Sequence, residues 1–462
     1  MSPPSLLTLR VTLSFWEDDP QVELALMLGA ESIDQGGRRW RISAFSLNVP
    51  ESIDSQTAPT FDLPLQLLEG LRASLAGQPK AMPLWLRFAK PHGHLGVLPW
   101  ERVLAEALDR PVLRLPDLLE RPHENRDVLE VAICFDAAPE TPQQEAVEQI
   151  TRSADAVMRA PPRSHTRISL FTTARWFESL CTSKLDRRLQ RHDPATAPTS
   201  GEAFKRARER KSFESAWSIW ISETLATRSL DAIHFICPSD VTDDGPALVT
   251  ASSPSPRESV PSLSYISPLQ IAAFMTRTGA WSALFTSPPG GTSGATMALF
   301  ADALAQTRPA SVLYQPLLTP EHATALRLCY AFLFSPRPAE APVLREGFLY
   351  CQPAFVTALA NLEVPSVLAA TQLNAALIEA AAPPGIEDFE QPPKWVNAVQ
   401  RHLEGLELEQ LRRSSPDVLL STPECARTQI DLSARSVTNE TEDETLADIQ
   451  KVVGSYLQKL RS

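Results

Sequence analysis

Residues 231–240 read DAIHFICPSD, and residues 281–296 read WSALFTSPPGGTSGAT. Each segment is an apolar run that breaks abruptly into small, polar, proline or glycine residues. A buried parallel strand has this pattern when it delivers a loop to the functional edge of a sheet. We therefore expect two strands whose following residues form a candidate site.

The sequence around these two segments alternates between strand-like and helix-like stretches, which predicts an α/β fold with a mostly parallel central sheet. Apolar runs predict strands at 129–135, 167–172, 232–237, 282–285 and 310–314. Apolar residues at helical spacing predict helices at 143–158, 213–225, 268–278, 294–305 and 323–334. Helices are expected on both faces of this sheet.

In spacing and flanks, the two opening segments resemble the His and Cys segments of a CHAT domain, a caspase-like cysteine protease module. In that family the segments read like HFxGHG and LNACESG, whereas this chain has HFICPS and LFTSPPG. The tripeptide PWE at 99–101 also resembles a segment found upstream of the CHAT core. The resemblance implies a caspase-like sandwich over residues 126–375.

The resemblance aligns the catalytic His with Pro238 and the catalytic Cys with Ser287. A proline cannot take up a proton, and a serine hydroxyl needs an adjacent base to act as a nucleophile. Pro288 also lacks the backbone N–H that often serves as an oxyanion donor after the nucleophile. We therefore expect a degenerate site with no catalytic residues, in a protein that is not an enzyme.

The first alternative is an active hydrolase in which Ser287 is the nucleophile and the base is His234 or a histidine from elsewhere in the chain. His234 aligns with the structural first His of the family motif, and a histidine on a buried strand is more often a hydrogen-bonded core residue. Gly290 and Gly291 belong to a loop whose backbone N–H groups would suit an anion. We prefer the simpler interpretation of this loop, an ordinary turn between strand and helix.

The second alternative is a nucleic-acid-binding subunit that uses the basic segment 184–211, which includes Arg206 and Arg208. A net charge of −12 argues against broad nucleic-acid binding and favours a solvated insertion. The six cysteines are scattered without CxxC spacing, so neither a zinc site nor a disulfide framework is expected. No metal or other cofactor is predicted.

The regions outside the predicted sheet differ in character. Residues 1–125 are expected to form a strand-rich module, with strands at 6–16, 40–47 and 83–88 and a helix at 61–75. Residues 376–462 are expected to form a helical extension. Its last helix, 441–461, carries an apolar face that would either pack on its own domain or dock a partner, made of Leu446, Ile449, Val453, Tyr456 and Leu460.

Neither a signal peptide nor an apolar run long enough to span a membrane is visible, so we expect a cytoplasmic protein without a membrane partner. The CHAT resemblance implies a setting in bacterial conflict or antiviral defence. The sequence therefore leads to the hypothesis of a non-catalytic scaffold, sensor or regulatory subunit. Its expected partner is another protein, such as an active protease or a defence effector.

Overall fold

The computed structural model describes residues 7–353, apart from short gaps at 17–18, 29–30, 33–38, 51, 54–60, 91, 117, 119–125, 161–162, 164, 182–188, 211–214, 226–227, 258–261, 289–293, 317–318 and 336–338. All of the described residues belong to one unit, 1–382. The predicted helix 441–461 and most of the predicted extension lie outside the described residues.

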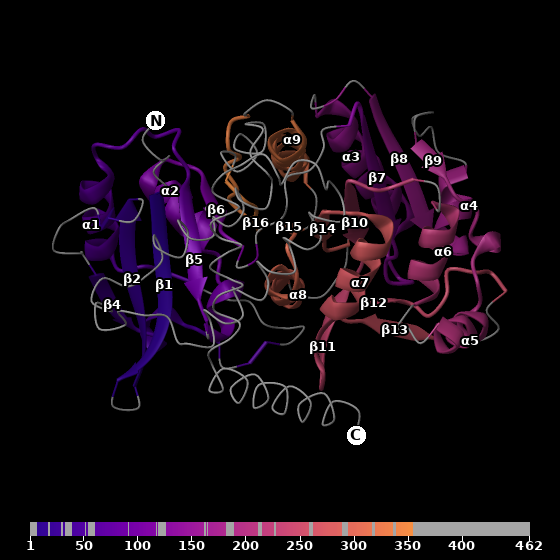
Figure 1. Ribbon diagram of the computed structural model, residues 1–462, viewed down its shortest axis with the longest axis horizontal. Coiled ribbons are helices and arrows are strands. Elements are labelled where there is room, and N and C mark those ends of the chain that lie inside the picture. Colours follow the sequence, from indigo (N-terminus) through magenta and orange to yellow (C-terminus); the bar gives the residue numbers. More distant parts are fainter. Residues whose placement is uncertain are drawn as a thin grey trace, which may run out of the picture. The chain divides into compact units, whose positions relative to one another are not determined.

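A single sheet of thirteen strands runs through the part of the chain that the structure describes (Figure 1). The strand order is β3-β2-β1-β5-β6-β16-β15-β14-β10-β7-β8-β9, and β4 pairs with β2. The first strands along the chain are β1 (Leu7–Trp16), β2 (Asp19–Leu28), β3 (Glu31–Ser32), β4 (Arg39–Ser43), β5 (Leu84–Ala89) and β6 (Val112–Arg114). The later ones are β7 (Val128–Phe135), β8 (His165–Thr172), β9 (Leu189–Arg191), β10 (Ala232–Ile236), β14 (Ser282–Thr286), β15 (Ser311–Gln315) and β16 (Phe348–Tyr350).

The strands from β9 across to β15 pair in parallel, and β16 is antiparallel to β15. The expected α/β class and mostly parallel central sheet are therefore confirmed. A separate small antiparallel sheet follows β10 and has the order β11-β12-β13. Its strands are β11 (Ser239–Thr242), β12 (Gly245–Ala251) and β13 (Leu263–Ile266). This small sheet is not predicted from the sequence.

Helices cover both faces of the parallel strands (Figure 1). Alternate residues of a strand point to opposite faces. Ile233 and Phe235 of β10 therefore pack with α6, α7 and α8, whereas Ala232 and Ile236 pack with α3, α4 and α9. These helices are α3 (Gln143–Arg159), α4 (Ala174–Cys181), α6 (Ala216–Thr224), α7 (Pro268–Thr278), α8 (Gly294–Thr307) and α9 (Pro320–Phe334).

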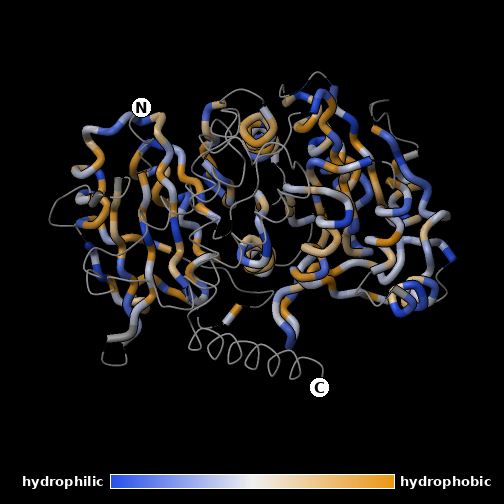
Figure 2. The backbone as a smooth tube through the Cα atoms, viewed as in Figure 1, coloured by the Kyte–Doolittle hydropathy of each residue, from blue (hydrophilic) through white to orange (hydrophobic). Residues whose placement is uncertain are grey.

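The N-terminal strands have their own core, which α1 (Leu65–Leu75) and α2 (Trp100–Leu108) help to enclose. They join the parallel strands through β6, which pairs with β16. The two regions predicted as separate modules thus share one sheet. Helix α5 (Ser200–Arg210) is drawn mainly in blue in Figure 2, in keeping with its charged side chains.

Two predicted elements in the N-terminal region differ from the structure. The helix predicted over 61–75 begins at Leu65, because Pro64 precedes it and a proline disfavours helical backbone at the residue before it. The strand predicted over 40–47 ends at Ser43. There the N–H of Ala44 donates to the carbonyl of Pro20, and the chain continues into a short 3₁₀ turn that ends at Asn48, whose φ is 51°.

Candidate functional site

The candidate site lies at the carboxyl ends of the parallel strands β7, β10 and β14. Because these strands run in the same direction side by side, the residues that follow them meet at one edge of the sheet. Asp136 follows β7, Cys237 and Pro238 follow β10, and Ser287 follows β14. The structure therefore brings the ends of the two opening segments together, as the sequence predicts.

His234 lies within β10 and is fully buried. Its Nε2 is 2.8 Å from Oγ1 of Thr286, the last residue of the adjacent strand β14. Nδ1 has no hydrogen-bond partner among the described residues. Burial lowers the pKa of His234 to about 3, because the charged imidazolium would lose its hydration. The imidazole is therefore neutral near pH 7 and is a poor general base.

The turn after β10 is fixed to the elements beside it. The carbonyl of Pro238 accepts a hydrogen bond from the N–H of Val249 at 2.9 Å. The hydroxyl of Ser239 is buried and lies 2.7 Å from Oγ1 of Thr296 in α8. These contacts hold Pro238 and Ser239 against β12 and α8, and the side chain of Pro238 has no group that accepts a proton.

The turn after β14 holds Ser287 and Pro288. Ser287 is partly exposed, and its carbonyl accepts a hydrogen bond from the side-chain amide of Gln149 in α3 at 2.9 Å. Pro288 is buried and has no N–H to donate. Within the described residues, no hydrogen bond joins the Ser287 hydroxyl to an imidazole. Gly290 and Gly291 lie outside the described residues.

Asp136 is an ionisable group at this edge that is not among the site residues predicted from the sequence. Its Oδ2 accepts a hydrogen bond from the N–H of Ala251 at 2.6 Å. Burial raises the pKa of this carboxyl to about 7, although the hydrogen bond opposes the shift. Burial, together with the Asp136 carboxylate, also raises the pKa of the neighbouring Cys237 thiol. An acidic residue directly after a buried strand was the signal available in the sequence.

A thiol is an effective nucleophile only to the extent that it ionises. Burial raises the pKa of the thiols of Cys134, Cys237, Cys329 and Cys351. All four are buried. Among the described residues, the site therefore offers a neutral buried imidazole, buried thiols and a carboxyl with a raised pKa, but no activated nucleophile.

The PWE segment forms part of a buried ionic cluster. Glu101 of α2 is 1% exposed and pairs through both carboxylate oxygens with the guanidinium of Arg114 in β6, at 2.6 and 2.9 Å. Arg114 is also stacked over the ring of Phe348, 3.7 Å from its centroid. The indole N–H of Trp100 donates to the carbonyl of Leu95 at 2.9 Å. This segment therefore stabilises the junction of β6 and β16.

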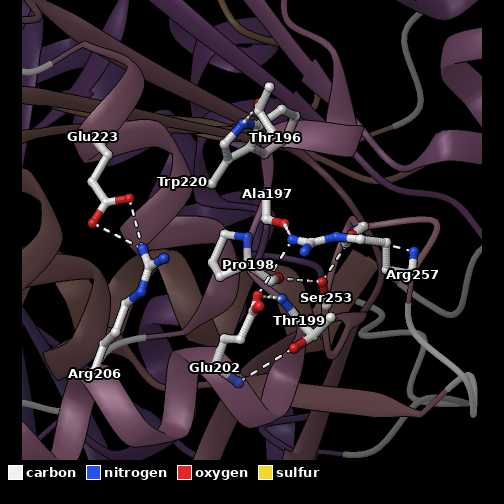
Figure 3. Close-up of polar contacts among 11 residues, drawn as sticks. Thr196, Ala197, Pro198, Thr199, Glu202, Arg206, Trp220, Glu223, Ser253 and Arg257 are labelled. Atoms are coloured by element: carbon white, nitrogen blue, oxygen red, sulfur yellow. Dashed lines mark hydrogen bonds and ion pairs between the residues drawn. The ribbon is translucent and has the colours of Figure 1, made fainter.

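The basic segment is partly neutralised by acidic neighbours. In Figure 3 the guanidinium of Arg206 reaches both carboxylate oxygens of Glu223 in α6, at 3.0 and 2.8 Å. Glu202, also on α5, lies 3.3 Å from Arg257. Arg208 is exposed on the same helix. Residues 184–188 and 211 of the predicted segment lie outside the described residues, as do Leu446, Ile449, Val453, Tyr456 and Leu460 of the predicted docking helix.

No protein-family model matches the chain, and a search of curated proteins gave no match. No group of three or more His, Cys, Asp or Glu side chains in the described ranges is arranged to hold a metal ion. The helices of those ranges include none that is long and apolar enough to cross a bilayer.

Proposed function

We propose that this chain is a non-catalytic, caspase-like protein of the CHAT type, which holds a protein partner rather than cleaving one. A mostly parallel sheet with helices on both faces is the architecture that the CHAT resemblance implies. The carboxyl edge of β10 and β14, where a CHAT protease would carry its His and Cys, serves here as a binding surface.

The observation that carries the proposal is the contact between His234 and Thr286. His234 is the histidine named as a base for the hydrolase alternative, yet it is fully buried, its Nε2 contacts Thr286 and its pKa is about 3. Pro238 and Pro288 remove two further functions, proton transfer and oxyanion stabilisation. These independent features favour loss of catalysis over a remodelled serine hydrolase.

The proposed partner is a protein of a bacterial defence assembly, such as an active protease, because the CHAT resemblance implies that setting. Ser287 is partly exposed at the edge, so a partner bound there would contact it. The nucleic-acid alternative is weaker, since Arg206 already has a carboxylate partner in Glu223.

Quantitative co-purification from the native host tests the binding proposal. Tagged wild-type protein should retain a specific protein that Ser287→Trp loses, because the large side chain would block the edge. Glu69→Trp, at an exposed position on α1, is the matched control and should retain the partner. Equal recovery with all three forms, or no specific protein with any of them, would count against a partner at this edge.

A further inference from the structure

A pocket of about 510 Å³ lies beside α2, away from the residues of the candidate site. Four cationic side chains contribute to its wall: Lys80, Arg102, Arg110 and Arg345. They come from the turn before β5, from α2, from the turn between α2 and β6, and from the segment before β16. Cationic side chains from four separate segments of the chain thus line the same pocket.

Arg110 distinguishes this pocket from a merely charged surface. It is only 4% exposed, and its Nε and Nη1 have no hydrogen-bond partner among the described residues. Burial lowers the pKa of its guanidinium, as expected for a cation that lacks a counter-charge. Buried charges in folded proteins are normally paired, because an unpaired one loses its hydration without compensation.

The backbone holds Arg110 in place. Asp109, the preceding residue, adopts a φ of 50° at the end of α2. The carbonyl of Pro111, the following residue, accepts a hydrogen bond from the N–H of Leu84 at 2.9 Å. Asp109 does not neutralise Arg110, because its carboxylate pairs instead with Lys80 at 2.5 Å. The backbone on both sides of Arg110 is therefore constrained, and Asp109 does not supply a carboxylate to its guanidinium.

We propose that this pocket binds a small ligand through one oxyanion group, a carboxylate or a phosphate, that pairs with Arg110. A planar guanidinium suits both groups because it can donate two parallel hydrogen bonds. Glu106 and Glu340 also contribute to the wall and would repel a ligand with several negative charges. Ala81 and Val343 offer apolar contact to a short organic body. This proposal does not depend on the function proposed for the sheet edge.

Calorimetric titration of the full chain with inorganic phosphate, and separately with acetate at matched ionic strength, tests the site. Wild-type protein should bind at least one of them saturably, with a Kd below about 10 mM. Arg110→Gln should weaken that binding at least about tenfold, because it removes a charge-assisted pair. As a control, Arg208→Gln replaces an exposed arginine on α5 and should change the affinity for the anion less than about twofold. A preference for phosphate or for acetate identifies the oxyanion.

Two further variants keep the test decisive if Arg110→Gln does not fold. Arg345→Gln, at the exposed rim, should weaken binding by about threefold. Arg110→Met should raise the thermal midpoint of the unliganded protein and abolish the stabilisation by the oxyanion, since a buried unpaired charge is replaced by an apolar chain. Absence of saturable binding to wild type, or equal binding by wild type, Arg110→Gln and Arg345→Gln, would overturn the proposal.

Discussion

Nε2 of His234 lies 2.8 Å from Oγ1 of Thr286, across the two parallel strands that lead to the candidate site. Both side chains are buried, so this hydrogen bond forms in a region of low polarity, where an unmade bond is costly. The contact fixes His234 as part of the core between β10 and β14. It also occupies one of the two ring nitrogens, Nε2.

Replacing Thr286 by valine should expose the structural role of this contact. The variant keeps the side-chain shape but leaves both ring nitrogens of His234 without a described partner. We expect the free energy of unfolding to fall by about 1–3 kcal/mol, measured by urea denaturation. Thr151→Val removes a hydrogen bond on a part-buried face of α3 and should cost less. Equal effects of the two substitutions would contradict this account.

The shifted pKa values of Asp136 and His234 predict opposing effects of pH on stability. Native Asp136, with a pKa of about 7, holds a proton that the unfolded chain releases near pH 4. Its contribution to stability is therefore complete at low pH and is lost as the pH rises through 7. Native His234, with a pKa of about 3, excludes a proton that the unfolded chain binds below 6.5. Its contribution is complete above 6.5 and is lost as the pH falls towards 3.

Asp136→Asn should separate these two effects. It removes the carboxyl titration but keeps an oxygen that can accept the bond from Ala251. Between about pH 4 and pH 6.5, the variant's stability should rise with pH more steeply than that of the wild type, by up to about 1.4 kcal/mol per pH unit. Urea denaturation across this range measures the difference. Asp243→Asn, at an exposed turn, should follow the wild type, and an Asp136→Asn curve parallel to the wild type would refute the assigned shift.

The Glu101–Arg114 pair predicts a large loss of stability when one partner is removed. Glu101→Ala leaves the fully buried guanidinium of Arg114 without its carboxylate, and we expect a cost of about 3–5 kcal/mol. Thermal and urea unfolding measure it. The exposed pair of Glu148 and Arg152 on α3 provides the control, and Glu148→Ala should cost less than about 1 kcal/mol. A loss of similar size in both variants would show that the PWE segment does not stabilise the junction of β6 and β16 through the Glu101–Arg114 pair.

The sequence predicts the parallel part of the sheet well because those strands are continuous apolar runs. The predicted helix 268–278 matches α7 (Pro268–Thr278), since Ser267 caps its start and Gly279, with a φ of 73°, ends it. Such signals are local. The small sheet β11-β12-β13 was missed although its turn contains Gly245 at a φ of 114°, because its strands are short and only partly apolar.

The candidate site was only partly predictable for a related reason. Neighbouring parallel strands end at the same edge of a sheet, and β10 and β14 are such neighbours. Pro238 and Ser287 could therefore be assigned to one candidate site from the sequence. The hydrogen bond between His234 and Thr286 joins residues 52 positions apart, and the bond from Ala251 to Asp136 spans 115. The burial that shifts the pKa of Asp136 depends on packing of distant segments, which periodicity does not reveal.

The nucleic-acid alternative makes a prediction that separates it from a protein-binding surface. If α5 bound a nucleic-acid backbone, affinity would fall with salt and would be reduced by charge reversal at Arg206 and Arg208. We expect no salt-sensitive binding of single- or double-stranded DNA or RNA by wild-type protein, because Glu223 and Glu202 offset the positive charge around this helix. Fluorescence anisotropy measures it, and binding that Arg206→Glu and Arg208→Glu abolish would establish the alternative.

Intact-mass spectrometry after exposure to a fluorophosphonate tests the central claim most directly, because this reagent modifies serine hydroxyls that an adjacent base has activated. Wild-type protein and Ser287→Ala should both remain unmodified under conditions in which a serine protease control is fully labelled. A single phosphonate adduct on the wild-type chain that disappears in Ser287→Ala would contradict the account and establish Ser287 as an active nucleophile.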